Sequence, residues 1–309
     1  MAVAKPSPPR SSATGMLAVT VAALAWSTAP VIVKSSELTG LRFAMYRLWI
    51  GVAIYAVVLV ITRRRLTWET FRRCGPGGLI FGVDISLAFA AFKLTSVADA
   101  TVIGALSPVV IALVSARLLR ERLGLTERGL AFVSFVGVVI VAVGSSGSPS
   151  WSLLGDLAAV GSIVTWTTYW FFSRHARHRA PAIEYMASVM IAAALLVTPV
   201  ALLFGRGALV PTADDWLAVA VTALVPGFIG HTLVAWSHSH VESWRSALIT
   251  QCHPVFASAW AAVFLGEELT PVVLAGIAIV LGATGIVIVR AARLPDVGED
   301  LEEAAEPAA

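Results

Sequence analysis

Apolar runs long enough to cross a bilayer recur along the whole chain, and they constrain its fold more than any other feature. They lie near residues 16–33, 41–62, 77–94, 98–117, 128–144, 152–173, 183–204, 216–237, 244–265 and 272–290. A helix needs about 20 such residues to cross the hydrocarbon core. Only 13% of the 309 residues are charged, against roughly 25% in soluble domains, which excludes a soluble globule. We expect an all-α polytopic membrane protein with ten transmembrane helices.

Several prolines mark where these helices are expected to begin. Pro76, Pro181, Pro211 and Pro271 each stand just before or at an apolar run. The first helical position tolerates proline because the N–H of that position has no intrahelical partner. The third helix is therefore expected to begin near residue 77.

The basic residues indicate how the chain is oriented. Seventeen of the 22 Lys and Arg residues fall on one side of the predicted membrane, which predicts cytoplasmic termini in a plasma or inner membrane. The arginines within residues 63–65 and 174–179 are expected to contact anionic lipid headgroups. Residues 1–15 and the acidic segment 293–309 are expected to be disordered cytoplasmic tails.

The sequence predicts neither a cofactor nor a metal site. It has no P-loop and no Gly-rich nucleotide motif, and its histidines lack compact ligand spacing. Cys74 and Cys252 lie in unrelated contexts, so no disulfide is indicated. Lys and Arg are scattered between apolar runs rather than clustered on a polar face, which argues against nucleic-acid binding. The expected partners are the lipid bilayer and a small-molecule substrate.

An internal repeat relates the two halves of the chain. A shift of 140 residues aligns Trp26 with Trp166, and a shift of 146 residues aligns Pro108 with Pro254. Each of these two prolines is followed 13 residues later by a glutamate, Glu121 or Glu267, which is expected to cap or pair at a helix end. The repeat predicts two halves of similar structure.

The number of spans in each half decides how the halves are related. Each half has five expected spans, and an odd number inserts the second half upside down. Inverted repeats of this kind are typical of secondary transporters. We expect one half over residues 16–146 and the other over residues 147–292.

Several short motifs stand together in this chain: Trp26-Ser27-Thr28 followed by Lys34, Arg47, Pro108 with Leu119-Arg120-Glu121-Arg122-Leu123, and Pro254 with Leu265-Gly266-Glu267-Glu268-Leu269. Through these motifs residues 16–290 resemble the EamA family of the drug/metabolite transporter superfamily. The chain departs from the family pattern at Arg120, where a glycine is usual, and at His253. The resemblance implies two inverted five-helix repeats around a central cavity that moves small metabolites or drugs, often outward.

Two charged residues fall inside the expected spans, where a charge must face a cavity or a partner. Asp84 lies near the middle of the third span and has no basic residue at i±3 or i±4. It is either a proton carrier and substrate ligand or a protonated carboxyl bonded to a neighbouring helix. Arg47 either extends outward to the membrane surface or serves as a fixed cation for a substrate carboxylate or phosphate.

His231 and His253 also fall inside spans, and a shift of 146 residues aligns Asp84 with Gly230, next to His231. Histidine exchanges protons near neutral pH, so His231 is a candidate for proton coupling together with Asp84, and both histidines are candidates for substrate binding. The alternative for each histidine is a neutral ring bonded to a backbone carbonyl.

Aromatic and hydroxyl side chains suggest a pocket for an apolar or aromatic solute. The candidates are Trp26, Thr28, Trp166 and Tyr169, with helix packing and an interfacial aromatic belt as alternatives. Prolines inside spans permit kinks, and we expect those of a gate at Pro30, Pro108, Pro226 and Pro254.

These features favour a secondary active transporter that works by alternating access. We expect it to export small metabolites such as amino acids, or amphiphilic drugs, either with proton coupling through Asp84 and His231 or by uncoupled facilitated exchange. One alternative is a membrane-embedded enzyme acting on a lipid-linked substrate, with Asp84 and a histidine as acid and base. Another is a structural membrane partner, which would lack converging polar groups.

Overall fold

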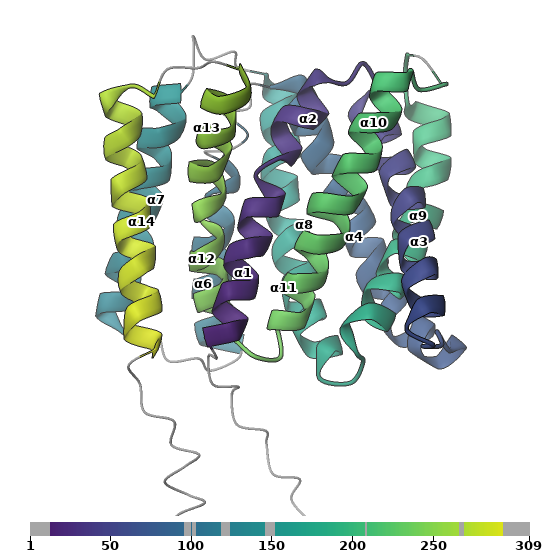
Figure 1. The fold of residues 1–309 in the computed structure, drawn as a ribbon, viewed down its shortest axis with the longest axis horizontal. Coiled ribbons are helices and arrows are strands. Elements are labelled where there is room, and N and C mark those ends of the chain that lie inside the picture. Colours follow the sequence, from purple (N-terminus) through teal and green to yellow (C-terminus); the bar gives the residue numbers. More distant parts are fainter. Residues whose placement is uncertain are drawn as a thin grey trace, which may run out of the picture.

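The computed structural model describes residues 13–95, 100, 103–118, 124–145, 152–207, 209–265 and 269–292. Within these ranges every regular element is a helix, and the long helices run alongside one another in a single bundle (Figure 1). Six stretches are long and apolar enough to cross a membrane: Ala13–Ser35, Gly40–Ile61, Trp68–Leu94, Ala182–Phe204, Ala213–Ser237 and Pro271–Arg290. This confirms an all-helical, multi-pass membrane protein.

The helices follow the expected apolar runs closely. The first part of the chain forms α1 (Ala13–Trp26), α2 (Ala29–Ser35), α3 (Gly40–Ile61), α4 (Trp68–Leu94), α6 (Leu106–Leu118) and α7 (Leu125–Ser145). The second part forms α8 (Leu153–Arg177), α9 (Ala182–Phe204), α10 (Ala213–Thr222), the π-helix η1 (Ala223–Gly230), α11 (His231–Ser237), α12 (Ser243–Thr250), α13 (Cys252–Leu265) and α14 (Pro271–Ala292). The start of α1 and the end of α14 lie at the same end of the bundle (Figure 1).

Helix breaks coincide with prolines inside the spans. Proline cannot donate to the carbonyl four residues earlier, and its ring clashes with that carbonyl. The carbonyl affected by Pro30 belongs to Trp26, where α1 ends. The carbonyl affected by Pro254 belongs to Thr250, where α12 ends. Pro226 lies inside η1, a π-helix whose wider turns interrupt the α-helical span at a third place.

The expected start of the third span is wrong by nine residues. α4 begins at Trp68 and continues through Pro76, which therefore lies inside the helix. The hydroxyl of Thr67 caps this helix by accepting a hydrogen bond from the backbone N–H of Thr70 at 3.2 Å. A polar first stretch thus extends the helix beyond its apolar run. Pro271, by contrast, is the first residue of α14, as expected.

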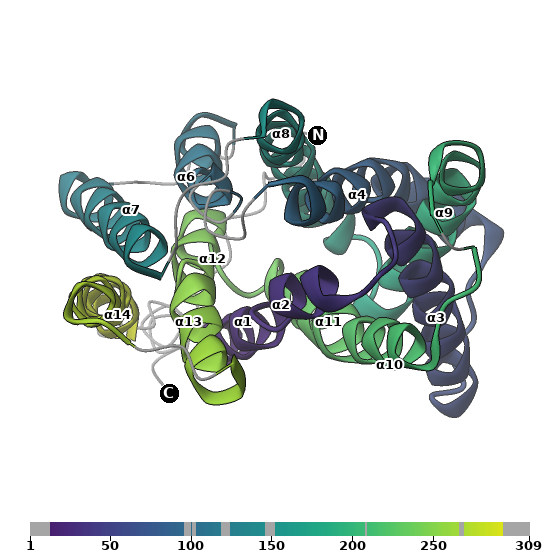
Figure 2. The same ribbon diagram turned by 90° about the horizontal axis from the view of Figure 1, so that it is seen from above.

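The two halves of the chain pack into each other. α1 contacts η1, α11, α12 and α13, and Figure 2 shows α1 lying beside this group. At the edge of the bundle α7 packs along α14, where Gly137 and Gly276 allow a close approach. A Cβ added at Gly276 would lie 2.9 Å from the carbonyl oxygen of Gly137.

Five helices meet in a buried apolar cluster in the part of the bundle toward the end where α1 begins. This five-helix cluster consists of Ala22, Ile111, Trp170, Val234 and Ala247. The Trp170 ring lies 4.6 Å from the ring of His238. His238 in turn has its Nδ1 atom 2.9 Å from the hydroxyl of Ser173. These contacts join α8 to the end of α11.

Arg174 and Arg177 were expected at lipid headgroups, and for these two residues the expectation is wrong. They are only 4% and 9% exposed. Arg174 donates to the carbonyls of His238 at 3.2 Å and Val241 at 2.7 Å, and Arg177 donates to the carbonyl of Ala235 at 2.8 Å. The last carbonyls of a helix have no intrahelical partners and carry partial negative charge. Arg177 therefore caps the end of α11, and Arg174 holds the turn that follows it.

Some of the expected features lie outside the described residues. They are Glu121 and Glu267 of the repeated motif, and most of the expected tails, residues 1–12 and 293–309.

Candidate functional site

A cavity of about 240 Å³ lies inside the bundle, and helices from both halves of the chain line it. On α4 the lining residues extend from Asp84 to Phe92, in the C-terminal part of that helix. On α6 they are Ser107 and Pro108, at its beginning. The cavity therefore lies toward the end of the bundle where α4 ends and α6 begins, while the five-helix cluster lies toward the other end.

Most of the sequence-predicted site residues line this cavity. The predicted ligands among them are Trp26, Arg47, Asp84, Trp166, His231 and His253. All four prolines predicted to form kinks also line it, namely Pro30, Pro108, Pro226 and Pro254. The sequence thus identified side chains from distant parts of the chain that the fold brings together.

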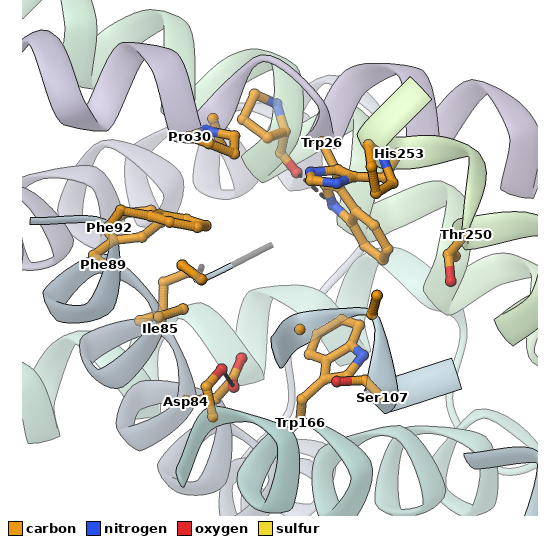
Figure 3. Close-up of a pocket in the computed structure, with 18 of the residues that line it drawn as sticks. Trp26, Pro30, Asp84, Ile85, Phe89, Phe92, Ser107, Trp166, Thr250 and His253 are labelled. Atoms are coloured by element: carbon orange, nitrogen blue, oxygen red, sulfur yellow. Dashed lines mark hydrogen bonds between the residues drawn. The ribbon is translucent and has the colours of Figure 1, made fainter. Parts of the chain in front are cut away.

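Trp26 and Trp166 form an aromatic pair in the cavity wall (Figure 3). Their ring centroids lie 5.4 Å apart and their planes are nearly perpendicular, at 81°. The indole Nε1 of Trp26 donates to the carbonyl of Pro226 at 3.2 Å, a contact that ties α1 to η1. The tryptophans therefore present ring surface to a solute from fixed positions.

Asp84 is held by hydroxyl groups of the neighbouring helix α8. Ser162 and Thr165 donate to its Oδ1 at 2.7 Å and 3.2 Å. The side chain is 4% exposed and lines the cavity. The hydrogen bonds to a neighbouring helix that the sequence allowed are thus present, and the carboxyl group still faces the cavity.

Arg47 is buried in the cavity wall and does not extend to the membrane surface, so the outward-reaching alternative is wrong. It is 2% exposed, and its guanidinium lies 5.9 Å from the ring centre of Phe81 and 5.6 Å from that of Phe89. Within the described residues its Nε and NH1 atoms have no hydrogen-bond partner. Gly227 of η1 leaves room for it, since a Cβ there would lie 3.3 Å from NH2. Arg47 thus presents unused donors beside the cavity.

The two histidines occupy different surroundings. His231 lies among aromatic rings, 4.9 Å from that of Phe81 and 5.1 Å from that of Trp26. His253 hydrogen-bonds to the backbone of Trp26, whose carbonyl Pro30 leaves without an intrahelical donor. No group of three or more potential metal ligands occurs among the described residues.

Thr28 and Tyr169 are not among the residues that line the cavity. The hydroxyl of Thr28 donates to the carbonyl of Ala25 at 2.8 Å, within its own turn. The hydroxyl of Tyr169 points to the sulfur of Met186 at 3.5 Å, in the core between α8 and α9. Both hydroxyls have partners elsewhere, so neither residue is available as a direct ligand in this structure.

The sequence reasoning missed several lining residues, of which Gln251 is the most polar. Gln251 forms the turn between α12 and α13 and is 2% exposed. The repeat relates Gln251 to a lining residue of the first half. Residues 104, 105, 107 and 108 line the cavity, and so do residues 250, 251, 253 and 254, each 146 positions later.

Comparisons with known proteins agree with this arrangement. The model of the EamA-like transporter family matches residues 13–143 and again residues 153–289. The aromatic amino acid exporter YddG of Ancylobacter novellus is 31% identical over 237 residues, which cover 74% of this chain and 79% of the exporter. A protein of known crystal structure has a similar fold, with a TM-score of 0.72 and 26% identity, over 90% of this chain and 98% of that protein.

Proposed function

Because this chain belongs to the EamA-like transporter family, we propose that it is a secondary transporter that exports amino acids with aromatic or large apolar side chains. The observation that carries the proposal is the composition of the cavity wall. It combines the buried cation of Arg47, the carboxyl group of Asp84 and a pair of tryptophan rings. The family consists of transporters, so the alternative of a membrane-embedded enzyme is set aside.

The charged groups of the wall suit a zwitterion. The guanidinium of Arg47, whose Nε and Nη1 atoms lack partners within the described residues, can donate a charge-assisted hydrogen bond to a carboxylate. Asp84 can accept a hydrogen bond from an ammonium group. The side chain of the amino acid would then contact Trp26 and Trp166. A single class of small solute thus satisfies the cation, the anion and the rings together.

The size of the cavity favours a metabolite over an amphiphilic drug. Its volume is about 240 Å³, while pockets for drug-sized ligands usually measure about 300–1,000 Å³. The relative with 31% identity is an aromatic amino acid exporter, which supports the same class of substrate and the same outward direction.

We propose that ten transmembrane helices form two inverted five-helix halves, residues 16–146 and 147–292, around this cavity. The family model matches the two parts of the chain separately. The helix turn at Ala105, before Pro108, recurs at Gln251, before Pro254. Two halves of similar build can exchange conformations, which is the basis of alternating access.

In the proposed orientation the protein lies in a plasma or inner membrane, and both of its termini lie in the cytoplasm. The five-helix cluster then separates the cavity from the cytoplasm, and the structure corresponds to the outward state. To reach the inward state, α8 must separate from α11 and α12. That movement breaks the contact of Ser173 with His238 and the contacts of Arg174 with the end of α11. Substrate must favour one state over the other to drive the exchange.

Asp84 also provides a simple means of proton coupling. If the substrate ammonium and a proton compete for the carboxyl group of Asp84, each conformational exchange of the transporter carries either the substrate or a proton across the membrane. Inward proton flow then drives outward movement of the amino acid. His231, which also lines the cavity, is proposed as the second group in this proton exchange.

The test uses purified protein in liposomes with a labelled aromatic amino acid. Wild-type protein should show counterflow, and a pH gradient should drive accumulation of the label. Asp84→Asn should abolish the pH-driven accumulation and leave a slower counterflow, since the amide still accepts one hydrogen bond. An unchanged pH dependence in the variant would remove Asp84 from the coupling scheme, and wild-type protein without counterflow of any aromatic amino acid would refute the substrate class.

A further inference from the structure

Gln251 is the only carboxamide side chain in the chain, because the 309-residue sequence contains no Asn and no other Gln. It lines the cavity and is 2% exposed. Within the described residues, neither its Oε1 nor its Nε2 has a hydrogen-bond partner. A buried polar group without partners destabilises a fold and calls for a specific explanation.

The first half of the chain indicates that the fold does not need this amide. The residue 146 positions earlier is Ala105, which forms the same turn three residues before Pro108 and lines the same cavity. The proline alone accounts for the break in the helix. Alanine makes the turn in one half, so the amide in the other half has a different role from making the turn.

Thr250, the residue before Gln251, lies across the cavity from Asp84. Figure 3 shows Asp84 and Thr250 on opposite sides of the cavity, with Trp26 and Trp166 between them. The hydroxyl of Thr250 donates to the carbonyl of Ala247 at 2.6 Å, and His253 bonds to the backbone of Trp26. Among Thr250, Gln251 and His253, the amide of Gln251 is therefore the polar group without a hydrogen-bond partner within the described residues.

We propose that Gln251 determines specificity by hydrogen-bonding the polar tip of the substrate side chain, so that tyrosine is preferred to phenylalanine. This inference rests on the proposed function, in which Arg47 and Asp84 bind the carboxylate and ammonium groups. A carboxamide has both a donor and an acceptor, and a phenol hydroxyl is both as well. The indole N–H of tryptophan pairs only with Oε1, and phenylalanine leaves both amide atoms unpaired. The expected order of affinity is tyrosine, then tryptophan, then phenylalanine.

The first test compares tyrosine with phenylalanine as competitors of labelled counterflow in proteoliposomes. Wild-type protein should prefer tyrosine by about three- to tenfold for each uncharged hydrogen bond that the phenol hydroxyl makes with the amide. Gln251→Leu should reduce this ratio to about one by weakening tyrosine while phenylalanine transport persists. Thr250→Val is the matched control and should keep the wild-type ratio, because the threonine hydroxyl already bonds within its own helix.

The second test uses the fact that the chain has a single carboxamide. Full-length wild-type protein made by cell-free synthesis with glutamine labelled with ¹⁵N at the side-chain amide should give one pair of amide proton resonances in nanodiscs. Tyrosine at saturation should shift this pair more than phenylalanine at saturation. This readout needs no variant, so it remains decisive if Gln251→Leu does not fold.

Each possible result bears on one proposal or the other. Wild-type protein that transports neither amino acid refutes the proposed function. If wild-type protein transports phenylalanine and tyrosine equally well, the role proposed for Gln251 is overturned, while the proposed function stands. The same conclusion follows if Gln251→Leu keeps the preference, or if both amino acids shift the labelled amide equally.

Discussion

Replacing Arg47 with methionine should abolish recognition of the carboxylate while largely preserving the fold. Two nitrogens of this buried guanidinium have no hydrogen-bond partner within the described residues. A hydrogen bond involving a charged group contributes about 1.5–3 kcal/mol, so the loss of one bond to a carboxylate costs at least about 1.5 kcal/mol. Since about 1.4 kcal/mol corresponds to a tenfold change in affinity, the loss should be at least about tenfold.

The effect on stability should be modest. Arg47 contacts the rings of Phe81 and Phe89, and each cation–π contact contributes about 0.5–2 kcal/mol. Methionine keeps apolar contact with both rings, so we expect the free energy of unfolding to fall by less than about 2 kcal/mol. A purely structural arginine would show the opposite pattern, with a large loss of stability and little change in selectivity.

The assay measures binding of phenylalanine and of phenethylamine, which lacks the carboxylate, to protein in nanodiscs. Wild-type protein should strongly prefer the amino acid, and Arg47→Met should lose that preference. Arg42→Met is the matched control on the same helix, because Arg42 is also buried but bonds the carbonyls of Gly205 and Gly207. This control should lower the melting temperature and keep the preference. If Arg47→Met still distinguishes the two ligands, the carboxylate does not bind at Arg47.

Two further predictions concern the cavity wall and the packing of the bundle. Trp166→Ala should raise the KM for phenylalanine by about tenfold, because one ring of the aromatic pair is lost; Trp49→Ala, at an exposed position, should leave KM unchanged in the same counterflow assay. Gly276→Leu should lower the melting temperature by several degrees, because its Cβ would lie 2.8 Å from Val141 and overpacking costs about 1–3 kcal/mol. Gly282→Ala has open space around it, and an equal loss of stability there would refute the packing argument.

The sequence predicted the spans well because crossing a bilayer imposes a simple physical requirement. Long apolar runs must be helical there, since lipid cannot pair with backbone polar groups. The start of α4 escaped prediction because Trp68 to Pro76 is not an apolar run. Its helix depends on the cap at Thr67, a local hydrogen bond that hydropathy does not reveal.

Candidate site residues could be predicted from the sequence where few structural roles are open to that residue type inside a membrane. Asp84 and Arg47 stood out because charge inside a membrane needs a partner, and Pro254 stood out because it breaks a helix. Gln251 did not stand out, because a single amide in an apolar run has no pattern of its own. Tyr169 illustrates the opposite failure. A tyrosine suits a ligand pocket, but the hydroxyl of Tyr169 points to Met186 in the core. The direction of this side chain depends on how the helices pack, which the sequence does not reveal.

The buried arginines at the end of α11 have a consequence for ion leakage. Arg174 and Arg177 are buried on the same side of the cavity as the five-helix cluster. Fixed positive charge between the cavity and that end of the bundle repels protons and other cations. A transporter in an energised membrane must not dissipate the voltage across it. The same two side chains that hold α8 to α11 would therefore also oppose the leakage of protons and other cations between the cavity and that end of the bundle.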